Sequence, residues 1–280
     1  MDPQHVFPPR KVLVPTDMSA ASESALKYAR YICERFKSEL LVIHAHHFEL
    51  PAYFSGAQMD DLKLELKRAA RNARDYVRKQ VEPLFGVVPE IEVIENSPVE
   101  AILGASRTRN ADLVIMGMHG HRGWERLWMG SVTEQVIRRS SLPVLAVSRP
   151  PSEAPVRRIL CPANPSDAGK QALEYAAKIS KAFDAHLTVL HVVEQGDEPL
   201  ACPLVDEPIK NSCHVEEIKL NGNAAKTIAE ASNSLKPDLI IMGAERKSAV
   251  MGEFFSTTTS SVMQMAVGPL MVVPRKAIDS

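Results

Sequence analysis

An internal duplication is the feature that most constrains the fold of this 280-residue chain. The segment KVLVPTDMSAASESALKYARYICERFKSELLVIHA, which begins at Lys11, matches RILCPANPSDAGKQALEYAAKISKAFDAHLTVLHV, which begins at Arg158. These segments are offset by 147 residues, whereas the later matches of ADLVIMG with PDLIIMG and of SLPVLAV with VGPLMVV are offset by 126. A repeat of this length predicts two copies of one domain rather than one large core.

The second copy is shorter, because the change of offset from 147 to 126 removes 21 residues between His191 and Asp238. In the first copy this region contains MDDLKLELKRAARNARDYVRKQVEPLF. Its apolar residues recur at helical spacing, at Leu62, Leu66, Ala70, Ala73 and Val77. The second copy has EQGDEPLACPLVDEPIKNSC instead, so we expect a loop there in place of one helix.

A proline-rich segment, RPPSEAP, lies between the copies. Prolines cannot donate hydrogen bonds to a strand or continue a helix, so this composition is typical of a linker. We therefore expect a first domain at residues 1–150, a linker at 151–155 and a second domain at 156–280 that lacks one helix.

Short apolar runs alternate with amphipathic segments in both copies. In the first copy the pattern predicts strands near 11–16, 39–45, 90–95, 112–117 and 143–148, and helices near 19–36, 58–84, 98–108 and 131–139. Continuous apolar runs such as ELLVIHA and DLVIMG are typical of parallel strands that helices cover on both faces. The predicted fold class is therefore α/β, present twice.

The charge balance argues against a polyanionic partner. Lys and Arg number 33 against 34 Asp and Glu, so no global field would gather the chain onto nucleic acid or anionic lipid. No segment approaches the roughly 18 continuous apolar residues of a membrane span, and the opening residues do not resemble a signal peptide. We expect a cytoplasmic protein with reduced cysteines and with no nucleic-acid or membrane partner.

The residues of greatest chemical interest follow the predicted strands. Thr16 and Asp17 come directly after the first strand, and Gly117 ends the fourth, with Gly120 shortly after it. In an open α/β sheet, ligands bind beyond the carboxyl ends of the strands. Gly117 and Gly120 are suited to positive φ and to close approach of a ligand to the backbone.

Ser131 stands where the last helix of the first copy begins. We expect Ser131 to be its N-cap, with Glu134 completing a capping box. A helix N-terminus collects free N–H groups and partial positive charge, which suits phosphate oxygens. From the residues alone, a simple turn at the glycines and a purely structural cap remain an equally good interpretation.

Other candidate motifs are incomplete. GNAAKT, from Gly222, lacks the second glycine of a phosphate-binding P-loop. The histidines of HAHH, from His44, could approach His119 and His121 at neighbouring strand ends, but His44 has a repeat counterpart in His191, which favours packing over metal binding. We therefore assign no catalytic residue and no metal ligand.

On these residues, the sequence resembles a tandem universal stress protein. Gly117, Gly120, Gly130 and Ser131 match the nucleotide motif of that family, G-x2-G-x9-G-S/T, and the resemblance runs from Lys11 to about Pro274. It implies two Rossmann-like domains of the adenine nucleotide alpha hydrolase type, each a five-stranded parallel sheet flanked by helices. It also implies that the domains pair through their last strands as an intramolecular pseudo-dimer, and leaves a further homodimer open.

The resemblance further implies ATP as the ligand of the first domain, with accompanying Mg²⁺ left open. Pro15, Thr16 and Asp17 would border the adenosine, and Ala45 would lie behind the base. Met116 and Gly117 would lie along the ribose, with Gly120, Gly130, Ser131 and Val132 around the phosphates and His119 in the same segment.

The second copy departs from the motif. Asn164 replaces Asp17, Arg246 replaces Gly120, and Ser256 and Thr257 replace Gly130 and Ser131. We predict that this copy does not bind ATP in the manner of the family.

The resulting interpretation is an ATP-binding module of stress response and signalling. No convincing general base lies beside the glycine loop, which argues against efficient phosphoryl chemistry. Two alternatives stay open: a slow ATPase, in which Asp17 or His119 helps to place Mg²⁺ or water, and a nucleotide-independent dimeric scaffold.

Overall fold

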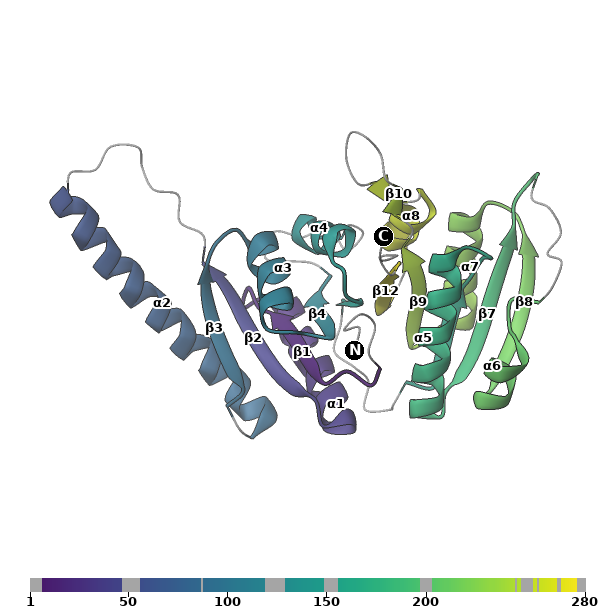
Figure 1. Ribbon diagram of the computed structural model, residues 1–280, viewed down its shortest axis with the longest axis horizontal. Coiled ribbons are helices and arrows are strands. Elements are labelled where there is room, and N and C mark those ends of the chain that lie inside the picture. The colour runs from purple at the N-terminus through teal and green to yellow at the C-terminus, as the bar shows by residue number, and fades with distance from the viewer. Residues whose placement is uncertain are drawn as a thin grey trace.

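A computed structural model shows a single large sheet covered by helices (Figure 1). It describes residues 7–46, 56–86, 88–118, 129–148, 156–196, 203–244, 246–247, 254–255, 257–265 and 268–275. The sheet has ten strands in the order β3-β2-β1-β4-β5-β12-β9-β6-β7-β8, and β10 and β11 form a separate two-stranded ribbon.

The N-terminal half closely follows the predicted pattern. Its elements are β1 (Lys11–Pro15), α1 (Ala20–Phe36), β2 (Glu39–His46), α2 (Gly56–Phe85), β3 (Glu90–Glu95), α3 (Pro98–Thr108), β4 (Leu113–Gly117), α4 (Ser131–Arg139) and β5 (Val144–Val147). Its strands pair in parallel, which confirms the predicted α/β class.

The C-terminal half repeats this order. Its elements are β6 (Arg158–Pro162), α5 (Asp167–Phe183), β7 (His186–Val193), α6 (Glu207–Ser212), β8 (Val215–Asn221), α7 (Ala224–Leu235), β9 (Leu239–Ala244), β10 (Arg246–Lys247), β11 (Phe254–Phe255), α8 (Thr257–Met265) and β12 (Leu270–Pro274). The expectation of a loop in place of α2 is wrong for 207–212, where the Asp206 carboxylate caps a short helix by accepting from the Ile209 amide at 3.0 Å.

The two halves join through their last strands. β5 and β12 pair antiparallel, with Leu270 opposite Ala146 and Val272 opposite Val144. Both strands are buried along their whole length, so each would leave an apolar edge exposed if the other were absent. This pairing confirms the expected pseudo-dimer and turns two five-stranded sheets into one. The predicted linker at 151–155 lies outside the described residues.

Helices cover both faces of the joined sheet. Residues of α1, α2 and α5 pack in the core on one face, and residues of α3, α4, α7 and α8 pack in the core on the other. The repeat also preserves the ends of its first helix. Ser19 and Ser166 cap α1 and α5, and both helices end in the left-handed region, at Lys37 and Asp184.

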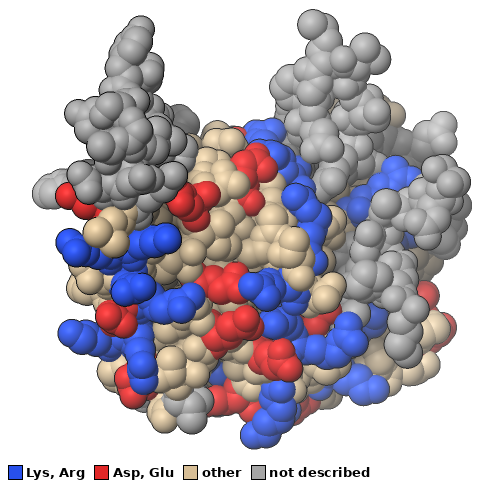
Figure 2. Space-filling model, turned by 60° about the vertical axis from the view of Figure 1, so that its left-hand side comes forward, with Lys and Arg blue, Asp and Glu red and all other residues tan. Residues whose placement is uncertain are grey.

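The surface shows no block of one charge on the face that Figure 2 views, where Lys and Arg are interspersed with Asp and Glu. This agrees with a formal net charge of -1. Among the described residues, no helix combines the length and apolar character needed to cross a bilayer.

Candidate functional site

The carboxyl ends of β1, β2 and β4 meet at one edge of the N-terminal half, because β1 pairs with both other strands. Pro15, Ala45 and Gly117 lie at or near the ends of these strands. The structure therefore brings together segments that are about 100 residues apart in the sequence.

The loop after β1 is tightly organised. The buried hydroxyl of Thr16 accepts from the Met18 amide at 3.0 Å and contacts the Ser22 hydroxyl at 3.1 Å, so it serves the loop itself. Asp17 is exposed, and its Oδ1 accepts from the amide and hydroxyl of Ser19, which is the N-cap of α1. The Asp17 carboxylate is thereby held at the mouth of the sheet edge.

Gly117 serves a packing role that the sequence did not predict. Positive φ occurs in the described glycines at Gly86, Gly196, Gly222 and Gly268, and not at Gly117. A Cβ on Gly117 would lie 2.8 Å from the carbonyl carbon and 2.9 Å from the Cβ of Ala21. The residue must therefore be glycine because α1 begins directly against the end of β4. The neighbouring Met116 is 4% exposed and packs in the core.

The start of α4 differs from the prediction by one residue. Gly130 is the N-cap, with φ −63° and ψ 143°, and Ser131 is the first helical residue, so the expected Ser131 cap is wrong. The expected capping box is absent as well, since the Glu134 carboxylate pairs with Arg138 at 2.6 Å. Gly130 has no side chain to cap the helix, and so no side-chain oxygen of its own occupies the first amides of α4.

Two hydrogen bonds hold this helix start beside β4. The buried Thr133 hydroxyl donates to the Gly117 carbonyl at 2.8 Å, and the Gly130 amide donates to the Met118 carbonyl at 2.8 Å. Exposed Ser131 and half-buried Val132 follow Gly130 at the same edge. Predicted site residues His119 and Gly120, together with His121 and both tryptophans, lie outside the described residues.

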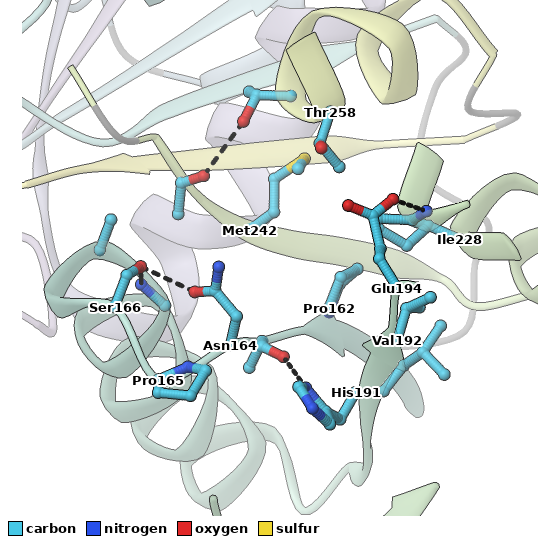
Figure 3. A pocket seen from close by; sticks show the side chains of 17 residues that line it. Pro162, Asn164, Pro165, Ser166, His191, Val192, Glu194, Ile228, Met242 and Thr258 are labelled. Carbon is cyan, nitrogen blue, oxygen red and sulfur yellow. Dashed lines mark hydrogen bonds between the residues drawn. The ribbon is translucent and has the colours of Figure 1, made fainter. Parts of the chain in front are cut away.

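The C-terminal half has a cavity of about 350 Å³ at the equivalent edge (Figure 3). It lies beyond β6, β7 and β9, between the loop after β6 and the helices α7 and α8. Asn164, Ser166, Glu194 and Thr258 contribute polar side chains, and Leu190, Ile228 and Met242 contribute apolar ones. By the sequence offsets, Asn164, Met242 and Thr258 are the counterparts of the predicted site residues Asp17, Met116 and Val132.

A contact between a histidine side chain and a backbone carbonyl recurs in both halves. Nδ1 of His44 lies 2.9 Å from the Thr16 carbonyl oxygen, and Nδ1 of His191 lies 3.2 Å from the Ala163 carbonyl oxygen. The two imidazoles thus join neighbouring strand ends, which supports a packing role for His44. Within the described residues, no group of three His, Cys, Asp or Glu side chains could hold a metal ion.

One contact in the C-terminal cavity has no counterpart in the first half. Oε1 of Glu194 accepts from the amide of Ala224, the first residue of α7, at 2.8 Å. At the position of Ala224 the first half has Pro98, which has no N–H to donate. No pattern in the sequence predicts this hydrogen bond.

The predicted replacement of the phosphate loop is partly visible. Arg246 lies in β10, opposite Phe255 of β11, but its side chain and all of Ser256 lie outside the described residues. The loss of ATP binding in this half therefore stays a prediction.

The thiols of buried Cys161 and half-buried Cys33 are poor candidates for nucleophiles. Burial raises the pKa of Cys161 to about 12, and burial together with the nearby Glu34 carboxylate raises the pKa of Cys33 to about 12. Both remain protonated at neutral pH and unreactive.

Comparisons with known proteins give matches over both halves of the chain. Residues 9–148, 155–212 and 210–274 match the model of the universal stress protein family. A universal stress protein of Mycolicibacterium smegmatis is 22% identical over 284 residues, which cover 94% of this chain and 96% of that protein. One from Methanocaldococcus jannaschii is 34% identical over 148 residues, or 51% of this chain and 85% of its own length. The crystal structure of a universal stress protein from Archaeoglobus fulgidus has a TM-score of 0.76 and 25% identity, and the match covers 96% of this chain and all of that one.

Proposed function

The chain belongs to the universal stress protein family, and from that premise we propose that its N-terminal half binds ATP and that the protein acts as a nucleotide-dependent stress-response and signalling module. The C-terminal half would then supply structural pairing and a separate surface rather than a second ATP site.

The start of α4 is the observation that carries this proposal. Its N-cap is Gly130, so no cap side chain competes for the first amides, and the helix dipole adds partial positive charge. The Thr133 hydrogen bond fixes these amides beside Gly117. An anion such as a triphosphate would find N–H donors already oriented, which limits the entropy lost on binding.

The remaining residues of this edge fit a nucleoside. The exposed Asp17 carboxylate is held by Ser19 and can accept from ribose hydroxyls or an adenine amine. Ala45 offers a small apolar surface near the end of β2. The Met116 side chain is buried, so the contact with the ribose expected of Met116 would be made by the backbone beside Gly117.

We propose binding with slow or no hydrolysis. Attack on a γ-phosphate needs a positioned water and charge neutralisation. Of the residues that the sequence predicts for this site, Asp17 alone offers a carboxylate, and it already accepts two hydrogen bonds from Ser19. Mg²⁺ would enter as the counter-ion of the nucleotide.

Calorimetric titration of Mg-ATP into the full chain tests the proposal, with phosphate release measured in the same samples. We expect about one ATP per chain. Gly130→Asp would cap α4 with a carboxylate where phosphate should lie and lower affinity on the order of 100-fold. The matched control is Gly104→Asp on α3, where a Cβ meets nothing within 4 Å.

Each other outcome has a definite meaning. Unchanged affinity in Gly130→Asp would remove α4 from the site, and absence of heat with the unmodified chain would favour the scaffold. Steady phosphate release would identify a slow ATPase.

A further inference from the structure

We propose that the side chain of Arg138 couples the two halves, so that an anion bound at the start of α4 changes the position of α8 and with it one wall of the C-terminal cavity. The coupling rests on the proposal that the N-terminal half binds ATP, and it names what the bound nucleotide would regulate. No ligand in the C-terminal cavity is required.

The two helices meet beside the joint between the halves. α4 and α8 are repeat counterparts, and they pack in the same core as β5 and β12, on one face of the sheet (Figure 1). Nη2 of Arg138 in α4 donates to the Ser260 hydroxyl in α8 at 3.2 Å. Both side chains are half-buried, so solvent screens this contact less than it screens one on the surface. The hydrogen bond thus joins one half of the chain to the other.

Arg138 is also tied to the first turn of its own helix. Its Nε and Nη2 donate to Oε1 of Glu134 at 3.0 and 2.6 Å. Glu134 comes four residues after the N-cap Gly130, which corresponds to about 6 Å along a helix axis. The guanidinium therefore lies at a distance on the order of the Debye length from a phosphate at the helix start, and salt screens their attraction only in part.

A bound triphosphate changes the balance of charge around this arginine. Its phosphates add negative charge toward the start of α4, so they attract the guanidinium in that direction. The Ser260 hydroxyl is neutral, and a neutral acceptor holds a guanidinium less strongly than a charged one does. When ATP binds, the hydrogen bond to α8 is therefore the contact that Arg138 gives up.

The start of α8 is held less firmly than the start of α4. The Thr259 hydroxyl lies 3.4 Å from the Gly243 carbonyl oxygen, whereas the equivalent bond from Thr133 to Gly117 is 2.8 Å long. Thr258 and Thr259 form part of the wall of the C-terminal cavity. A shift of α8 on its release from α4 therefore changes the shape of that cavity.

The repeat shows that this arrangement is one-sided. Ser260 and Gln264 of α8 occupy the places that Glu134 and Arg138 have in α4. α8 thus lacks the ion pair of α4, and a charge at the start of α8 has no arginine at this position to act on.

Methionine methyl signals can read both ends of the coupling in the full chain labelled with ¹³C-methyl methionine. Met116 lies near the end of β4 at the ATP edge, and Met263 is a buried residue of α8, so leucine variants at these positions assign the two signals. Mg-ATP is titrated into the unmodified chain, into Ser260→Ala and into Ser261→Ala, which alters the next hydroxyl of α8 as a matched control.

A second pair of variants tests the arginine itself. Arg138→Gln removes the charge that contacts α8. Its matched control is Arg139→Gln, which removes the same charge from the next residue of α4, where the side chain pairs with Glu100 of α3 at 2.7 Å.

We expect the Met116 and Met263 signals of the unmodified chain to shift with the same apparent Kd for Mg-ATP. Ser260→Ala removes the contact in advance, so its Met263 signal should start near the ATP-bound position and move about threefold less on titration. Arg138→Gln should reduce the Met263 shift similarly, and both control variants should keep it. The Met116 shift should persist in every variant.

The two proposals can fail separately. A Met116 shift without a Met263 shift would overturn the coupling alone, as would a Met263 shift that is unchanged in Ser260→Ala. A Met263 shift that saturates at a different ATP concentration would also overturn it, because ATP would then act on α8 from another place. If neither signal moves in the unmodified chain, the proposed ATP site fails and the coupling fails with it.

Discussion

The loop after β1 and the loop after β6 occupy equivalent places in the two halves, yet their backbones take different paths. Met18 has φ 65°, whereas its counterpart is Pro165, whose ring does not permit that value. In the C-terminal loop a Cβ on Gly169 would overlap the Asn164 carbonyl oxygen, and its counterpart Ser22 carries a side chain without difficulty. The two halves thus differ at two linked positions of the duplicated loop, Met18 against Pro165 and, four residues later, Ser22 against Gly169.

The strands and their joints vary much less between the halves. Asp112 accepts from the amides of Arg10 and Lys11, and Asp238 accepts from those of Arg157 and Arg158 in the same way. Duplication has therefore kept the groups that build the sheet while the ligand edge has diverged. The loss of a family motif in one copy predicts the loss of its ligand there, without implying that the edge has no ligand at all.

The largest expected effect comes from exchanging the loop residues. Gly169→Ser should lower the free energy of unfolding by about 3 kcal/mol, because the new Cβ overlaps the Asn164 backbone. Ser22→Gly should cost about 1 kcal/mol, from the greater freedom of glycine and the lost bond to the Ser19 carbonyl. Urea unfolding of the full chain measures both.

Adding Pro165→Met to Gly169→Ser sharpens this test. The methionine restores access to the left-handed region that Met18 uses, so we expect it to recover part of the lost stability. Equal costs for the two single variants would show that the two loops do not differ in the way described.

Much of this fold could be predicted from the sequence, because it depends on periodicity and on the repeat. Strand and helix limits in the first copy came within two residues, whereas the joint between SLPVLAV and VGPLMVV was expected only from the family resemblance. Such signals are local, since apolar strands and amphipathic helices reveal themselves in short windows.

The site was predicted less completely, because its details depend on contacts between distant segments. Gly117 is required by Ala21, nearly a hundred residues earlier, and no local pattern carries that information. The cap at Gly130 rather than Ser131 depends on where the backbone turns, and both residues are acceptable N-caps. Glu194 and Ala224 meet only because β7 and α7 pack together.

A smaller effect is expected from the paired aspartates. Asp112→Ala should cost about 2–3 kcal/mol, because its side chain is 2% exposed and water cannot easily replace the two lost bonds to backbone amides. Asp238→Ala should cost about 1 kcal/mol, since its side chain is 31% exposed and water can reach the same amides. Urea unfolding at neutral pH measures both. An equal loss of stability in the two variants would contradict the expectation that the difference in burial of Asp112 and Asp238 sets the cost.

The smallest effect concerns a position where the halves differ only in their buried side chain. Cys161 in β6 corresponds to Val14 in β1, and both are buried without exposure. Burial raises the pKa of the Cys161 thiol from 9.0 to about 12, so the unfolded chain loses this proton at lower pH than the folded chain. The stability that the neutral thiol contributes is fully present below pH 9 and is lost as pH rises toward 12.

Between pH 8 and pH 10 this linkage should remove about 1 kcal/mol from the free energy of unfolding. Cys161→Val, which copies the first half, should abolish that part of the decrease while leaving the contribution of Cys33. Unfolding by urea at the two pH values, with Cys33→Val as the matched control, measures the difference. If Cys161→Val and the unmodified chain lose the same stability over this range, then the Cys161 thiol titrates in the folded chain as it does in the unfolded chain. In that case β6 would exclude water less well than β1.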